Sequence, residues 1–252
     1  MIAEFKGVYA GAWRYALACP LLFAVPAIAE LIQHAIEIRI GMYDTIAGLK
    51  AAETSGARLG WGLVKTLSIT LAGFWVARFL LLPDGAAAAR WFDPVAVRLY
   101  FWVMLWGLAQ TALSLWGGDA LRAAGLGAYA VGGAIALGLA TFILNIMLAP
   151  WIVAAALGNP DLGFVRSLRL VGWSVWWGLL FCIATILVPM VLHYALAVPA
   201  IGASPAVLWA IMAVDALLVG CLAAIIAATN VAIARRAVEN SDAILVARSA
   251  AR

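Results

Sequence analysis

The chain has 252 residues, of which 67% are hydrophobic and only 11% are charged. Soluble domains carry about 25% charged residues, so a water-soluble fold of this length has too little polar surface to cover so many apolar side chains. The net charge of +4 comes from basic residues scattered along the chain, which argues against a nucleic-acid partner. The composition predicts an integral membrane protein.

Six apolar stretches are each long enough to cross a bilayer, whose hydrocarbon core needs about 20 residues of helix. The alternating pattern of membrane strands is missing, so we predict an all-α, polytopic bundle. The segments between the stretches are too short to fold a core of their own, which predicts one membrane domain over residues 1–252. The predicted spans are residues 14–38, 60–82, 97–117, 125–157, 173–200 and 205–233.

The basic residues indicate the orientation of these spans. One side of the predicted membrane holds Lys6, Arg14, Arg78, Arg90, Arg98, Arg166, Arg169, Arg235, Arg236, Arg248 and Arg252. The opposite side holds Arg39, Lys50, Arg58, Lys65 and Arg122. Because the cytoplasmic side of a membrane protein carries the excess of Lys and Arg, we expect both termini to be cytoplasmic.

Small residues recur at every fourth position of the fourth stretch, at Ala128, Gly132, Ala136 and Ala140. Such a stripe lets another helix approach closely. It favours a tightly packed central helix, and the alternative is a face for homo- or hetero-oligomers. Membrane lipids are the other expected partners.

Ionisable residues in the outer half of the membrane are the candidate site residues. Glu30, His34 and Glu37 share one helix face at spacings of four and three, and Lys65 and His193 come from other spans to the same depth. One hypothesis is a proton or substrate site in a cavity open to the outer face. The alternative, which the sequence favours for the first three residues, is that they face headgroup water where the helix leaves the membrane.

Asp215 is the strongest single candidate, because it lies well inside the sixth span. About ten residues separate it from Ser204 at the helix start, or roughly 15 Å at the α-helical rise. Charged groups near the membrane centre are costly and usually face an interior site. We therefore expect Lys65 or a histidine to hold the Asp215 carboxylate.

Signatures of enzymes and of resident cofactors are missing. The chain has no HExxH, no nucleophile elbow and no phosphate-binding Gly-Lys-Ser loop. Cys19, Cys182 and Cys221 lie inside predicted helices without CxxC spacing, which is typical of buried hydrophobic residues. Glu and His on one helix face can ligate a metal, but we predict no resident metal and no cofactor.

The segment between the fourth and fifth spans predicts a short amphipathic helix on the cytoplasmic surface. Gly158-Asn159-Pro160 breaks the preceding helix, and Asp161 has the character of an N-cap. Apolar residues then repeat on the face opposite Arg166 and Arg169, which with Trp173 are candidate contacts for lipid headgroups.

This segment resembles a recurring element of the YciC-like inner-membrane proteins and of the membrane domain attached to some glycerophosphodiester phosphodiesterases. The matching residues are Ala149-Pro150, Ser167-Leu168-Arg169-Leu170 and the aromatic run from Trp173 to Trp177. Leu168 stands where the phosphodiesterase pattern commonly has an aromatic residue, and there is no catalytic barrel, so the resemblance implies no hydrolase activity. It implies a multi-pass protein of the bacterial inner membrane with a role in the envelope.

Three functions follow from the sequence. The leading hypothesis is a non-catalytic inner-membrane protein that acts as an envelope or lipid-associated accessory protein or complex subunit. The alternative is a small transporter or channel with an outward-facing polar cavity around Asp215. The third is a membrane-embedded lipid enzyme.

Overall fold

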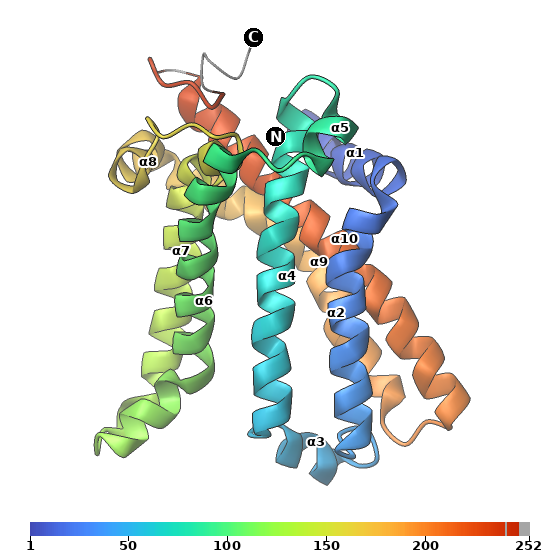
Figure 1. The fold of residues 1–252 in the computed structure, drawn as a ribbon. Coiled ribbons are helices and arrows are strands. Elements are labelled where there is room, and N and C mark those ends of the chain that lie inside the picture. The colour runs from blue at the N-terminus through green and yellow to red at the C-terminus, as the bar shows by residue number, and fades with distance from the viewer. Residues whose placement is uncertain (240, 247–252) are drawn as a thin grey trace.

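The computed structural model describes residues 1–239 and 241–246, and all regular structure in this part is helical (Figure 1). Six segments of it are long and apolar enough to cross a membrane, which confirms the prediction of an all-α, multi-pass membrane protein. These segments are Pro20–Arg39, Gly56–Leu81, Pro94–Ala123, Gly127–Ala156, Phe164–Ala200 and Pro205–Val238.

The helices form a bundle with two distinct ends. In chain order they are α1 (Ile2–Ala18), α2 (Pro20–Arg39), α3 (Ile46–Ala52), α4 (Gly56–Leu81), α5 (Gly85–Arg90), α6 (Pro94–Ala123), α7 (Ala130–Ala156), α8 (Phe164–Val171), α9 (Val175–Ala200) and α10 (Pro205–Val238). Figure 1 shows α1, α5 and α8 at one end, called here the α8 end, and α3 at the other, called the α3 end. In the predicted topology the α8 end is cytoplasmic.

The predicted first span, residues 14–38, is wrong at its beginning. The chain breaks at Cys19, so that α1 ends at Ala18 and α2 begins at Pro20. Proline suits the first position of a helix because its missing N–H would have no partner there. The membrane-crossing helix is therefore α2, whereas α1 lies at the α8 end and packs against α10 (Figure 1).

The central helix of the bundle is α10, which packs against α1, α2, α4, α7 and α9. In its apolar window 56% of the residues are buried, compared with 11% in each of the segments that contain α6 and α7. Small residues at Ala223, Ala224, Ala227 and Ala228 permit these close approaches. The prediction that the fourth span is the tightly packed central helix is thus wrong.

The α6–α7 pair lies at one side of the bundle (Figure 1). The predicted stripe of Ala128, Gly132, Ala136 and Ala140 is exposed on it. A groove of about 590 Å³ between the two helices is lined instead by residues such as Gly117, Gly133 and Leu137. The stripe therefore does not pack inside the part of the chain that the structure describes.

A hydroxyl group joins α8 to the preceding span. Ser167 is fully buried, and its Oγ donates to the Met147 carbonyl at 2.8 Å and accepts from the Trp151 N–H at 3.1 Å. In a regular helix these two backbone groups would bond each other, so the hydroxyl is inserted into α7 beside Pro150. This contact links the Ala-Pro and Ser-x-Arg-Leu parts of the predicted element.

The predicted start of α8 at Asp161 is wrong, because the helix begins at Phe164 with Gly163 at the N-cap. Asp161 instead donates its backbone N–H to the Asn159 side chain, 3.0 Å away. Arg166 lies 3.3 Å from the Asp242 carboxylate, Arg169 is exposed, and Trp173 is 88% exposed. The position of α8 at a membrane surface stays a prediction.

Arg78 on α4 is buried and holds three helices together. Its guanidinium donates to the carbonyls of Ala88, next to the end of α5, and Ala156, at the end of α7. Replacing Arg78 by methionine leaves both carbonyls without this donor, so we expect the free energy of unfolding to fall by about 1–2 kcal/mol. Chemical unfolding in detergent micelles measures the change. Arg14→Met, at an exposed position, is the control and should be close to neutral.

Candidate functional site

The ionisable residues of four spans meet at the α3 end in one buried group, called here the polar cluster. It consists of Glu30, Gln33, His34 and Glu37 on α2, Tyr43 in the following loop, Arg58 and Lys65 on α4, His193 on α9, and Asp215 on α10. The glutamates at 30 and 37 and the histidine at 34 are only 1%, 2% and 4% exposed. The hypothesis that they face headgroup water is therefore wrong, because α4 and α10 pack over their side of α2.

Asp215 is held by two histidines. Its Oδ2 lies 2.9 Å from His34 Nε2, and its Oδ1 lies 2.7 Å from His193 Nδ1. Lys65 does not reach Asp215 as its partner; its ammonium lies 3.0 Å from Oε2 of Glu30. Of the two predicted partners for Asp215, the structure thus selects histidine.

His34 bridges two carboxylates. While Nε2 faces Asp215, Nδ1 lies 3.0 Å from Oε2 of Glu37. An ionised carboxylate accepts hydrogen bonds only, and a neutral imidazole donates from one nitrogen only. The arrangement therefore contains one extra proton, carried either by the His34 ring or by one of the two carboxyl groups.

The Glu37 carboxylate accepts more hydrogen bonds than any other group of the polar cluster. In addition to His34, it accepts from Tyr43 at 2.8 Å, Gln33 at 2.9 Å and Arg58 at 2.9 Å. Burial, reinforced by the Glu37 carboxylate, raises the pKa of Tyr43, so the phenol stays protonated as a donor. These contacts fix the end of α2 against the loop that follows it.

The charges of the cluster balance when the extra proton is present. Glu30, Glu37 and Asp215 supply three negative charges, and Arg58 and Lys65 supply two positive ones. A protonated His34 makes the group neutral, which is the condition under which buried charges are least costly. Loss of that proton leaves a net negative charge in a buried site.

A cavity of about 160 Å³ lies among these side chains and has room for an ion or a few water molecules. Arg58, Lys65 and His193 are partly exposed, with side-chain exposures of 28%, 21% and 16%, so the cavity is reached from their side. An apolar layer that includes Met42, Ala200, Leu208 and Met212 lies beside it toward the α3 end.

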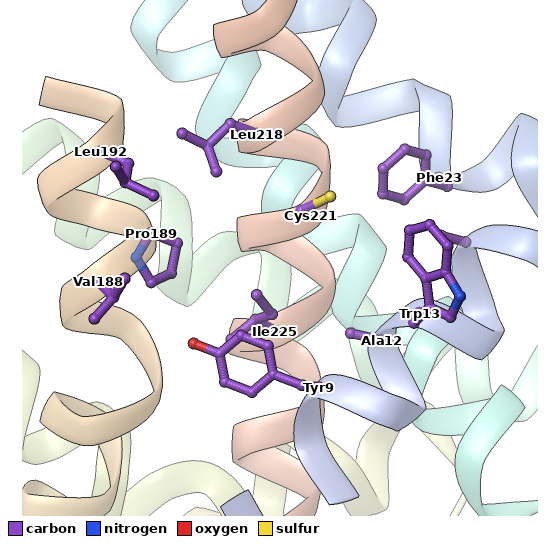
Figure 2. A pocket seen from close by; sticks show the side chains of 11 residues that line it. Tyr9, Ala12, Trp13, Phe23, Val188, Pro189, Leu192, Leu218, Cys221 and Ile225 are labelled. Carbon is purple, nitrogen blue, oxygen red and sulfur yellow. The ribbon is translucent and has the colours of Figure 1, made fainter. Parts of the chain in front are cut away.

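A second cavity, of about 280 Å³, is apolar (Figure 2). Figure 2 shows Pro189 and Leu192 on α9 facing Cys221 and Ile225 on α10, with Trp13 of α1 on the opposite side. The Tyr9 hydroxyl at its edge donates to the Thr185 carbonyl at 2.8 Å. This space suits an apolar chain and leaves room beside Pro189.

Sequence reasoning found part of the cluster. Glu30, His34, Lys65, His193 and Asp215 were predicted as candidates, and the structure brings all five together. Gln33, Tyr43 and Arg58 were missed as members. For Gln33 the signal was its place beside His34 on α2, whereas nothing in the sequence places Tyr43. The predicted headgroup contacts, Arg166, Arg169 and Trp173, lie at the α8 end, away from the cluster.

No protein family model, no curated protein and no solved structure matches the chain.

Proposed function

We propose that the protein is a transporter that exchanges protons for a small cation, with the polar cluster as the binding site. The observation that carries the proposal is His34, held between the carboxylates of Glu37 and Asp215 in a buried group. Ionisable residues inside the membrane are costly, and proton relays are among the functions that retain them. The coarser property, a multi-pass membrane protein, rests on the six spans.

The charge balance of the polar cluster couples the binding of a cation to the release of a proton. With its extra proton the cluster is neutral, and without it the three carboxylates exceed the two fixed cations by one charge. A monovalent cation that enters the cavity restores neutrality, and a divalent ion does so when Lys65 turns out of the cluster. Reprotonation removes the attraction that held the cation. Proton and cation therefore compete for the same negative charge.

Two prolines lie where a moving transporter needs hinges. Pro26 precedes Glu30 by four residues on α2, and Pro189 precedes His193 by four residues on α9. Proline removes a backbone hydrogen bond and bends a helix. Bending at these points would move the halves of α2 and α9 that carry the site, and the apolar cavity beside Pro189 gives α9 room to move.

The test uses purified protein in liposomes that enclose a pH-sensitive dye. We expect an outward-directed gradient of a transported cation, sought among Na⁺, K⁺, Mg²⁺, Mn²⁺ and Zn²⁺, to drive proton uptake. Asp215→Asn keeps the size of the side chain but removes the charge between the histidines, so it should reduce this flux at least about 100-fold. Asp119→Asn, at an exposed position on α6, is the control.

Proton flux that does not respond to any of the cations, or that is equal in Asp215→Asn and in the wild type, would contradict the proposal. The folding of each variant is checked by its elution as a single species in detergent. The control should keep the flux of the wild type, because Asp119 is exposed and pairs with Arg122 near the end of α6.

The second candidate is the accessory or subunit function in the bacterial inner membrane, as the YciC-like resemblance implies. The exposed small-residue stripe on α7 and the groove between α6 and α7 favour it. In this case Gly132→Leu would change the oligomeric state or the association with a larger complex and leave proton flux unchanged. Arg166, Arg169 and Trp173 would then contact the headgroups of the cytoplasmic leaflet.

A further inference from the structure

We infer that Glu30, His193 and Asp215 form a binding site for a divalent transition-metal ion of the Zn²⁺ type. One ligand atom from each residue lies within 4.8 Å of the others, and the three residues come from α2, α9 and α10. This inference rests on the proposed function, because it names the class of cation that the cavity takes. It also revises the sequence prediction that the chain holds no metal.

An unpaired acceptor atom in the same cavity points to a cation. Gln33 is 5% exposed, and its Oε1 is buried without any hydrogen-bond donor among the residues that the structure describes. Oε2 of Glu30 is also buried in this cavity, and its partner is the Lys65 ammonium at 3.0 Å. Buried acceptors normally have partners, and a bound cation with its water molecules would supply one for Gln33.

The donor set selects the class of metal. Two carboxylates and one imidazole suit Zn²⁺ and neighbouring transition metals, whereas Ca²⁺ and Mg²⁺ prefer oxygen ligands alone. The carboxylates of Glu30 and Asp215 balance the charge of a divalent ion once the Lys65 ammonium has turned away from Glu30. Three protein ligands leave at least one position for water, which the 160 Å³ cavity accommodates.

The neighbours of the three ligands are arranged to support an ion. His34 bonds Oδ2 of Asp215 and thereby orients the carboxylate, while Oδ1 points toward His193. Removing a residue that orients a metal ligand in this way commonly lowers metal affinity about 10- to 100-fold. Lys65 must leave Glu30 when the ion binds, and its side chain, 21% exposed, is long enough to turn toward the surface.

The experiment titrates metal-free protein in lipid nanodiscs with Zn²⁺, and with Co²⁺ as a spectroscopic probe. We expect one ion per chain and a rise in the unfolding midpoint with Zn²⁺, because the ion binds the folded protein. His193→Gln and Glu30→Gln should each weaken binding at least about 100-fold. Glu53→Gln, at an exposed carboxylate beyond α3, is the matched control and should bind like the wild type.

A readout on the wild type alone covers the case in which a variant does not fold. X-ray absorption of the bound Zn²⁺ should show oxygen ligands and imidazole nitrogen. The absence of binding, ligation without imidazole, or binding that survives both substitutions would overturn the inference.

The experiments distinguish failure of the metal site from failure of the proposed transport. Proton exchange driven by a monovalent cation, without any Zn²⁺ binding, would overturn the metal site and leave the proposed transporter. Zn²⁺ binding that both substitutions abolish, without any cation-driven proton flux, would support the metal site and overturn the proposed transport.

Discussion

Replacing Glu37 by leucine is expected to lower the free energy of unfolding by about 3–5 kcal/mol. Glu37 is 2% exposed and accepts from His34, Tyr43 and Arg58. The substitution removes the counter-charge of Arg58 and the acceptor that His34 and Tyr43 share. Removing one partner of a buried ion pair is costly because the other charge stays in a poorly solvated site.

Chemical unfolding in detergent micelles measures this loss. A double-mutant cycle shows how much of it comes from the ion pair between Glu37 and Arg58. Arg58→Met in the Glu37→Leu background should cost less than in the wild type, since the guanidinium has already lost its partner. Glu53→Leu is the control, because this carboxylate is exposed and outside the cluster. A loss below about 1 kcal/mol for Glu37→Leu would mean that the cluster contributes little to stability.

The six spans could be predicted because composition and length decide them with little help from tertiary structure. That Glu30, His34 and Glu37 share one helix face could also be predicted, since it follows from helical periodicity alone. Their burial was not, because it depends on how α4 and α10 rotate against α2. His34 and Asp215 are 181 positions apart, and the sequence contains no signal for that pairing.

The small residues show the same limit. Alanines and glycines occur at close spacing on both α7 and α10, and both patterns permit close packing. In the structure the helix with the central position is α10, while Gly132 and Ala136 on α7 are exposed. A pattern of small residues thus indicates where a helix can be approached, but not which helix approaches it.

Local chemistry explains the remaining differences. Asp161 and Gly163 both precede α8, and the Asn159 side chain satisfies the backbone N–H of Asp161 before the helix begins. Pro20 is a sequence signal for the break at Cys19, but apolar residues on both sides of it predicted one continuous span. Tyr43 joins the cluster only because the loop after α2 turns back over it, with the Tyr43 carbonyl accepting from the Gly202 N–H at 2.8 Å.

Gly220→Leu is expected to cost about 3 kcal/mol of unfolding free energy by overpacking the contact between α2 and α10. A Cβ at this position would lie 3.1 Å from the Phe23 ring and 3.3 Å from Cβ of Ala27, and the rest of the leucine side chain has to enter the same space. Gly138→Leu is the matched control, because a Cβ there meets nothing within 4 Å. Unfolding of the two variants side by side in detergent micelles measures the difference.

The same substitution connects the packing of α10 to the site. Gly220 follows Asp215 by five residues, or about 7.5 Å along the helix, so moving α10 away from α2 also separates Asp215 from His34 on α2. We therefore expect Gly220→Leu to impair cation-driven proton uptake as well as stability, whereas Gly138→Leu leaves both unchanged. A Gly220→Leu variant with normal stability would show that Phe23 yields into the neighbouring apolar cavity, which it lines. In that case the 2.9 Å contact between His34 and Asp215 does not depend on the close approach at Gly220.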